Sequence, residues 1–167
     1  MSHRSLLLAV AVLGVGSFAV ADEAAMPPHT MLMPDEIKWG EGPPSLPPGG
    51  KMAVMLGDPS KPDMYILRAK LPAGYKIPAH WHPTTENITV LSGVFMMGEG
   101  DKLDAATAKA YPAGSIMSMP AKQHHFAMTK KETVIEVSGM GPFAITYLDP
   151  ATDPRNAAAA ATTPAKK

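Results

Sequence analysis

The sequence of 167 residues contains no cysteine. This absence excludes disulfide bonds, a thiol nucleophile, thiolate zinc sites and iron–sulfur clusters. The sequence also lacks an excess of either charge, because Lys and Arg together number 15 and Asp and Glu together number 15. A protein that grips nucleic acid electrostatically needs a basic face, so we expect no nucleic-acid partner. With 46% hydrophobic and 18% charged residues, the chain is expected to fold rather than remain disordered.

Long uncharged apolar runs are also scarce, and the clearest one lies near the N-terminus. Residues 6–20 follow a short segment that contains Arg4, and they lead into Ala19-Val20-Ala21, which fits the small-x-small rule for cleavage. A membrane-spanning helix needs roughly 20 apolar residues, which makes an uncleaved anchor the less favoured alternative. We therefore expect residues 1–21 to be a signal peptide that sends the protein to the periplasm or outside the cell. After cleavage no membrane partner is expected.

Proline and glycine are abundant, with 18 and 14 residues respectively. This composition favours short strands joined by turns over long helices. Prolines are concentrated in residues 22–50, which we interpret as an extended N-terminal arm with one short strand near Ile37–Trp39. Residues 150–167 contain many alanines and are expected to form a flexible tail. The remaining residues, 51–149, are predicted to form one domain.

The segment 51–149 consists of short apolar runs separated by turn residues, which is typical of a strand-rich domain. One stretch, Leu103–Lys109, is instead predicted to form a short helix. We therefore expect an all-β fold of antiparallel strands, arranged as a barrel or a sandwich. The predicted strands are Met52–Leu56, Met64–Leu71, Tyr75–His82, Glu86–Leu91, Val94–Met97, Ser115–Met119, His125–Met128, Thr133–Val137 and Phe143–Leu148.

Three residues in this segment form a candidate metal-ligand set. His80 and His82 stand two residues apart in a predicted strand, so their imidazoles lie on the same face. Glu86 begins the next strand, where alternation places it on the inward face with Ile88 and Val90. A carboxylate that faces an apolar interior is costly unless it is paired or bound to a metal ion. Two imidazoles and a carboxylate that converge suit a transition metal, whereas a lone His-x-His more often lies on an exposed strand edge.

These residues belong to a longer pattern of fixed spacings. Intervals of five, one, three and six residues separate, in order, Gly74, His80, His82, Glu86 and Gly93. This pattern resembles the first motif of the cupin superfamily at every fixed position. The match predicts that the three central residues bind a metal ion.

A second motif follows in the expected order. Five residues separate Gly114 from Pro120, and His125 follows. Over residues 51–149 the chain therefore resembles the cupin superfamily, specifically its small single-domain members of the cupin 2 conserved barrel type. Lys122 departs from the second motif, which usually has glycine there. Lys122 implies that this turn either avoids a left-handed conformation or tolerates one at a cost.

A second departure lies at Thr129, where the motif usually has asparagine. Neither departing position is a metal ligand in the family, so the predicted site is unaffected. His124 is the rival to His125 as a ligand. Adjacent strand residues face opposite ways, so only one of the two can point inward, and the family spacing selects His125.

The resemblance implies an antiparallel jelly-roll β-barrel with a metal site formed by His80, His82, Glu86 and His125. Three imidazoles and one carboxylate suit a divalent transition metal (Fe, Mn, Ni, Cu or Zn) rather than calcium. Four protein ligands on an octahedral ion leave two positions for a small-molecule ligand or substrate. Small cupins often pair with exchanged N-terminal strands, so the resemblance also implies a homodimer in which residues 22–50 cover an exposed strand edge.

The open coordination positions favour one functional hypothesis, a metal-dependent oxidoreductase of dioxygenase type. A non-enzymatic module that binds a small ligand or a metal ion is the first alternative, because the sequence offers no obvious proton-transfer residue beyond the ligand set. Metal-dependent isomerase or lyase chemistry is the second alternative.

Overall fold

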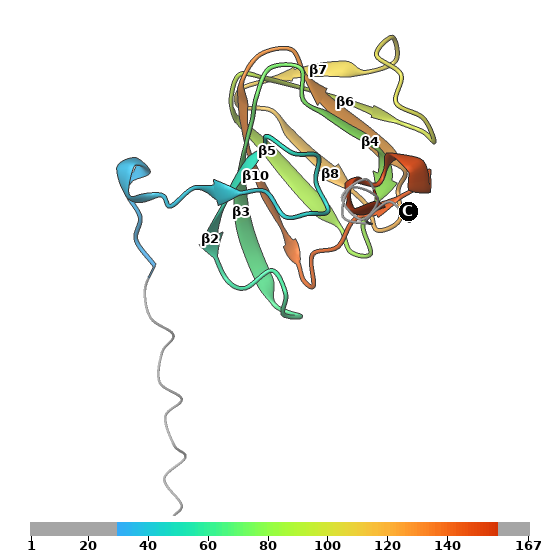
Figure 1. The fold of residues 1–167 in the computed structure, drawn as a ribbon. Helices are drawn as coiled ribbons and strands as arrows, with labels where there is room; N and C mark the ends of the chain where they lie inside the picture. The colour runs from blue at the N-terminus through green and yellow to red at the C-terminus, as the bar shows by residue number, and fades with distance from the viewer. Residues whose placement is uncertain (1–29, 157–167) are drawn as a thin grey trace, which may run out of the picture.

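A computed structural model describes residues 30–156 (Figure 1). The predicted signal peptide, residues 1–21, lies outside the described residues, as do the first part of the predicted arm and residues 157–167 of the predicted tail. Within residues 30–156, none of the helices has the length and apolar character needed to cross a membrane.

The regular secondary structure of the described chain consists mainly of strands, in two sheets whose strand pairs are all antiparallel. The first sheet has the order β1-β2-β3-β10-β5-β8 and the second has the order β11-β4-β9-β6-β7. Successive strands from β3 to β6 alternate between the two sheets, which closes the sheets around a common interior as a jelly-roll β-barrel. The all-β prediction is therefore confirmed.

The strands of the first sheet are β1 (Gly40–Glu41), β2 (Lys51–Leu56), β3 (Met64–Leu71), β10 (Thr133–Met140), β5 (Glu86–Ser92) and β8 (Ile116–Met119). Those of the second are β11 (Thr146–Tyr147), β4 (Lys76–Trp81), β9 (His125–Thr129), β6 (Val94–Glu99) and β7 (Lys109–Pro112).

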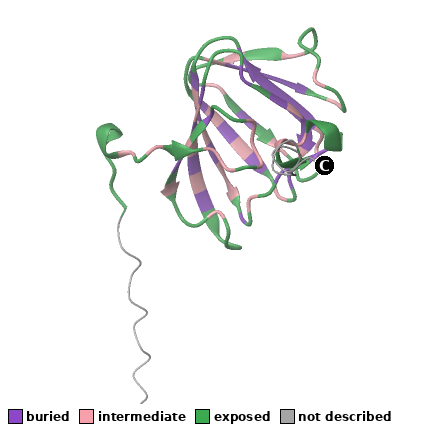
Figure 2. Ribbon diagram, in the orientation of Figure 1, coloured by how far each residue is buried: buried purple, intermediate pink, exposed green. Residues whose placement is uncertain are grey.

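The alternation of buried and exposed residues along the strands explains why these segments pair. In β3, every second residue from Tyr65 to Leu71 is buried, and in β10 Ile135 and Val137 are buried in the same way. Side chains on one face of neighbouring strands pack on each other, so this alternation forms one apolar layer between the sheets. Figure 2 shows the buried positions along the strands that face the interior.

The predicted helix at Leu103–Lys109 is wrong. The segment forms turns, in which Asp104 accepts hydrogen bonds from the backbone of Ala106 and Thr107, and Lys109 begins strand β7. A helix this short is marginal without a packed face. Pairing of β7 with β6 satisfies the backbone groups of both strands instead.

The predicted arm contains a 3-10 helix, η1 (Pro34–Glu36), followed by β1. The short strand therefore lies just after its predicted position at Ile37–Trp39, which is a correction to that prediction. The ring of Trp39 lies under Lys70 Nζ, 4.7 Å from it, and β1 pairs with β2 beyond that contact.

Residues 150–156 of the predicted flexible tail are attached to the barrel. A second 3-10 helix, η2 (Pro150–Thr152), is capped by Asp149, whose side chain accepts a hydrogen bond from Ala151 N at 2.9 Å. Further on, Arg155 donates a hydrogen bond to the backbone oxygen of Ile145 at 3.2 Å. These contacts hold the end of the described chain beside β11.

Candidate metal centre

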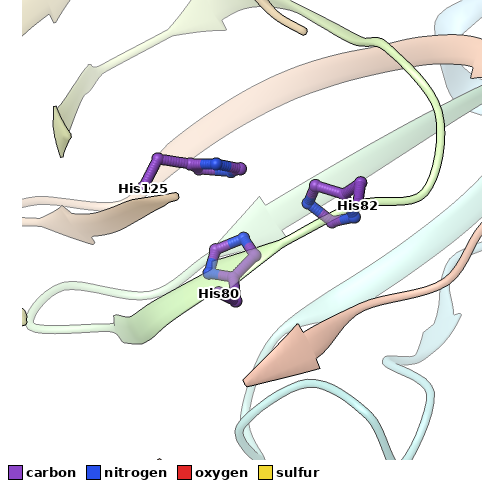
Figure 3. A group of neighbouring side chains, drawn as sticks. All are labelled: His80, His82 and His125. Atoms are coloured by element: carbon purple, nitrogen blue, oxygen red, sulfur yellow. The ribbon is translucent and has the colours of Figure 1, made fainter. Parts of the chain in front are cut away.

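His80 lies near the end of β4 and His82 follows that strand directly, so both imidazoles point into the barrel and are buried (Figure 3). The Nδ1 atom of His80 lies 2.7 Å from the backbone oxygen of Pro78, and the Nδ1 atom of His82 lies 2.7 Å from that of Ala144. A carbonyl oxygen can only accept a hydrogen bond, so each Nδ1 carries the proton. This arrangement leaves each Nε2 as the ring nitrogen with a lone pair available to a metal ion.

His125 opens β9, and its Cα pairs with that of His80 across the sheet. Its Nδ1 atom lies 2.9 Å from the backbone oxygen of Gln123, which fixes the same tautomer. The ring centroids of His80 and His125 are 4.2 Å apart, and those of His82 and His125 are 5.3 Å apart. Each of the three imidazoles offers a ligand atom, and these atoms all lie within 4.8 Å of one another. Figure 3 shows the three side chains converging from β4 and β9.

Glu86 faces the histidines from the other sheet, where it is the first residue of β5. Its Oε2 atom lies 3.5 Å from Nε2 of His82 and 3.5 Å from Nε2 of His125. The carboxylate is buried, and the alternation of β5 also buries Ile88 and Val90, as the sequence predicts. The tertiary structure therefore brings all four predicted residues together, the three imidazoles as a tight group and the carboxylate against two of them.

His124 and His125 face opposite ways. The side chain of His124 is 40% exposed and its Nδ1 atom lies 2.7 Å from Oδ1 of Asp101, whereas the side chain of His125 is 2% exposed. The inward residue of the pair is thus the one that the spacing of the second motif selects. His124 lies on the outside of the barrel with an acidic partner of its own.

The surroundings of His80 and Glu86 shift the pKa of both groups. Burial first, and then the neighbouring His125 and His82, lowers the pKa of His80 from 6.5 to about 3. Burial acts to raise the pKa of Glu86, but the adjacent ring of His125 first, and then those of His82 and His80, outweigh it, and the pKa falls below its usual value. A neutral imidazole and an ionised carboxylate at neutral pH are the forms that bind metal ions.

One atom of the cluster lacks a partner. Within residues 30–156, Nε2 of His82 is a buried side-chain nitrogen without a hydrogen bond. A buried polar atom left unsatisfied costs about 1–3 kcal/mol, so such atoms usually have a function or a ligand. Three imidazole nitrogens, one of them unsatisfied, and a carboxylate oxygen make a donor set that fits a divalent transition metal.

The two residues that depart from the second motif, Lys122 and Thr129, form hydrogen bonds next to the site. Lys122 adopts a left-handed conformation with φ of 64°, and its backbone N–H donates to the backbone oxygen of His82 at 2.8 Å. Of the two conformations that the sequence leaves open for Lys122, the structure shows the tolerated left-handed turn. Thr129 accepts a hydrogen bond from Tyr75 N through its hydroxyl at 3.1 Å, which ties the far end of β9 to the start of β4.

Two residues that line the cavity beside the cluster were not predicted from the sequence. Phe143 stacks on the ring of His82 with the centroids 5.3 Å apart, and Leu46 reaches the cavity from the N-terminal arm. Neither residue belongs to a motif. The one signal in the sequence is the apolar side chain of Phe143 in a predicted strand, which is compatible with an inward position.

No protein-family model matches the sequence, and no curated protein matches it either. Solved structures do match. A candidate acetylacetone dioxygenase from Methylibium petroleiphilum is 17% identical, with a TM-score of 0.59 and coverage of 83% of this chain and 98% of its own. The polyketide cyclase RemF from Streptomyces resistomycificus is 13% identical, with a TM-score of 0.58 and coverage of 78% and 93%. An RmlC-like cupin from Shewanella frigidimarina is 12% identical, with a TM-score of 0.53 and coverage of 68% and 91%.

Identities this low establish a shared fold and leave the reaction open. The strand topology, the positions of both motifs and the structural matches agree with one another. The chain therefore has the cupin fold, and the resemblance to the cupin superfamily predicted from its two motifs is confirmed at the level of the fold.

Proposed function

We propose that this protein is a metal-dependent oxidoreductase of dioxygenase type that acts on a small organic substrate. The observation that carries the proposal is the buried group of His80, His82 and His125, in which Nε2 of His82 has no partner within the described chain. The donor set of three nitrogens and one oxygen suits Fe, Mn, Ni, Cu or Zn in the divalent state.

In this proposal the three histidines hold the metal through Nε2 and Glu86 holds it through its carboxylate. The bound ion would supply Lewis-acid and redox chemistry to oxygen ligands in the two coordination positions that the protein leaves free. The backbone oxygens of Pro78, Ala144 and Gln123 keep the imidazoles oriented and increase their basicity as ligands.

The structural matches are compatible with more than one reaction. The similar folds include a candidate dioxygenase and a polyketide cyclase, so the fold alone does not select a reaction class. The preference for oxygen chemistry comes from the donor set and its open positions. Glu86, as the one carboxylate in the set, would offset part of the charge of a divalent ion.

A second candidate function is a non-enzymatic module that captures a small ligand or a metal ion. The cavity next to the histidines favours it, because its volume is only about 40 Å³ and its wall beyond the ligand set is apolar. A site built only to retain an ion needs no larger space.

Metal analysis and oxygen uptake separate these functions. Protein purified from its own compartment should contain about one divalent transition ion per chain, measured by elemental analysis, as a four-ligand site predicts. Iron-, manganese- or nickel-loaded protein should then consume oxygen with at least one member of a panel of phenols and diketones. Retention of the metal without turnover on any compound supports the binding module, and a folded protein with no metal affinity contradicts both functions.

We also propose that the protein is exported. The charged start, the apolar run and the small-x-small site of residues 1–21 support this localisation. Mass spectrometry of the protein from a cell fractionation should find a mature chain that begins at Asp22 in the periplasm or the medium. A full-length chain in the cytosolic fraction contradicts the proposal.

We further propose a homodimer. Two methionines of the described arm, Met31 and Met33, are 84% and 64% exposed and precede β1 at the edge of the first sheet. Exposed apolar side chains beside a sheet edge favour contact with a second copy. Analytical ultracentrifugation should give twice the chain mass, and Met31→Ser with Met33→Ser should shift the equilibrium toward the monomer.

A further inference from the structure

The cavity beside the candidate ligands is small. Its volume is about 40 Å³, and its wall includes His80, His82 and Glu86. One buried water takes roughly 10–15 Å³, so the cavity holds about three waters. Pockets that enclose an organic molecule usually have volumes of roughly 300–1,000 Å³. An organic substrate therefore fits beside these residues only if part of the wall moves.

One part of that wall comes from the N-terminal arm rather than from the barrel strands. Leu46 lines the cavity and packs against the main core from the loop Gly42–Gly50. The ends of the loop are held together because Gly42 N donates a hydrogen bond to Gly50 O at 2.9 Å, and the loop is tightened where Leu46 N donates to Pro43 O. Compact loops with close ends are frequently functional.

Two tyrosine hydroxyls tie this loop to the second sheet. The hydroxyl of Tyr147, in β11, donates a hydrogen bond to the backbone oxygen of Ser45 at 2.9 Å. The hydroxyl of Tyr75, just before β4, donates to the backbone oxygen of Pro47. Each such bond contributes only modestly to stability because water replaces it, so displacing the loop costs far less than unfolding the barrel.

The opposite side of the same loop lines an outer groove of about 440 Å³. Glu41, Pro48 and Pro154 border this groove, and Leu46 borders both the groove and the inner cavity. In Figure 1 the loop is the cyan stretch after β1 that runs toward the red C-terminal part of the described chain. Leu46 thus lines both a groove of substrate size and the cavity beside the buried histidines.

We propose that Leu46 is the gate between the outer groove and the cavity, and that displacement of the loop Gly42–Gly50 admits a small, largely apolar molecule with an oxygen donor for the metal. The ligand class follows from the walls, which beyond the candidate ligands are apolar. The apolar wall residues are Leu46, Met52, Leu67, Ala69, Leu71, Ile77, Ile135, Val137, Phe143 and Ile145. The choice of ligand rests on the proposed metal function, but the gate itself can be tested on metal-free protein.

The first experiment measures access to the buried histidines without metal. Diethyl pyrocarbonate modifies neutral imidazoles, and peptide mass spectrometry gives the modification rate of His82 relative to His124 in the same molecule. The side chain of His124 is 40% exposed and serves as the internal reference. In the unaltered protein, we expect His82 to react at least about tenfold more slowly than His124, because reaction requires local opening.

The variants identify the gate. Leu46→Ala and Tyr147→Phe should each raise the rate at His82 by about threefold or more and leave His124 unchanged, since both ease local opening of the loop. Leu56→Ala, an exposed leucine in β2, should change neither rate. Val90→Ala removes core volume away from the cavity wall and controls for a general loosening of the barrel.

Two outcomes overturn the gate. In the first, His82 reacts at the same rate in the unaltered protein, in Leu46→Ala and in Tyr147→Phe. In the second, Val90→Ala raises the rate at His82 as much as the loop variants do. If Leu46→Ala fails to fold, Tyr147→Phe decides the test.

The second experiment measures ligand size in protein loaded with cobalt(II), whose visible spectrum reports the binding of oxygen donors. Alkyl hydroxamates of increasing chain length serve as probes. Leu46→Ala should tighten the binding of the longer probes by about tenfold relative to acetohydroxamate, and Leu46→Phe should weaken it, because a pocket contact of this size changes affinity by that order. An unchanged length dependence contradicts the role of Leu46 in ligand size. Failure to bind cobalt contradicts the proposed metal function instead, and the labelling result for the gate still stands.

Discussion

The Nε2 atom of His125 lies 3.5 Å from the Oε2 atom of Glu86 across the interior of the barrel. His125 belongs to β9 in one sheet and Glu86 belongs to β5 in the other. The ligand set therefore exists only when the two sheets are packed together. A metal ion held by both residues would bind the folded state alone and would add its binding free energy to stability.

His125, which opens β9, and His124, which precedes it, provide the first prediction. We expect His125→Ala to lose the metal and His124→Ala to keep about one ion per chain, because only His125 points toward the other ligands. Elemental analysis of both purified variants, beside the unaltered protein, measures the outcome. Loss of metal from His124→Ala alone would show that the register assigned to the second motif is incorrect.

The carboxylate provides the second prediction. Glu86→Gln keeps the size of the side chain and removes its charge, so we expect metal affinity to fall by about tenfold or more. Competition with a coloured chelator measures the affinity. Glu136→Gln is the matched control, because Glu136 forms a partly exposed ion pair with Arg68 at 2.8 Å on the outer side of the sheet. Equal affinities for the two variants would remove Glu86 from the ligand set.

Metal binding should stabilise the fold, which is the third prediction. At a free metal concentration of 100 times Kd, the free energy of unfolding should rise by about 2.7 kcal/mol, because the unfolded chain has no assembled site. Urea titrations with and without metal measure the increment. His82→Ala should abolish the increment while His124→Ala retains it, and an increment that survives in His82→Ala would mean that the metal binds elsewhere.

The lowered pKa of His80 predicts how stability depends on pH in the metal-free protein. The unfolded chain takes up a proton at His80 near pH 6.5, whereas the folded protein excludes it until about pH 3. Stability is therefore greatest above pH 6.5 and falls as the pH decreases, with a contribution of up to about 1.4 kcal/mol per pH unit from this one group. The lowered pKa of Glu86 acts in the same direction, but only below its usual value of 4.5.

Urea titrations between pH 6.5 and 4.5 isolate this contribution from that of Glu86. His80→Gln should flatten the decline in this range, because the titrating group is gone. A decline that is identical in the unaltered protein and in His80→Gln would contradict the assignment to His80.

The turn at Lys122 provides the fifth prediction. A left-handed conformation costs a residue with a Cβ about 1–2 kcal/mol, and glycine avoids that cost. Glycine also has more conformational entropy in the unfolded chain, which offsets part of the gain. Lys122→Gly should therefore stabilise the protein by about 0.5–1 kcal/mol in urea titrations, and the hydrogen bond from its N–H to His82 is kept. Lys130→Gly, at an exposed position without positive φ, should destabilise it. Stabilisation by both substitutions, or by neither, would contradict the strain at Lys122.

Most strands could be predicted because each one carries its own alternation. The bounds of Met64–Leu71 agree with β3, since every second residue of that segment is apolar and buried. The helix predicted at Leu103–Lys109 does not form, because the local pattern there suits a single helical turn as well as a loop. Strand β7 begins at Lys109 because the edge of β6 offers backbone partners, which depends on residues distant in the sequence.

The sequence alone determined the membership of the candidate site. The spacing of His80, His82 and Glu86 follows from strand alternation and a short turn, and both are local properties that the order of residues specifies. It also determined the kind of chemistry available, since a chain without cysteine has no thiolate to offer and its candidate donors are nitrogen and oxygen atoms.

Only the tertiary structure decided how that site is closed. Leu46 lines the same cavity as His80 and His82 because hydrogen bonds from Tyr75 and Tyr147 hold the loop Gly42–Gly50 against the barrel. These partners lie up to 102 residues apart in the chain. The alternation of apolar and polar residues along one strand does not specify such a contact. The contact exists only after the two sheets have packed and created the interior that the loop covers.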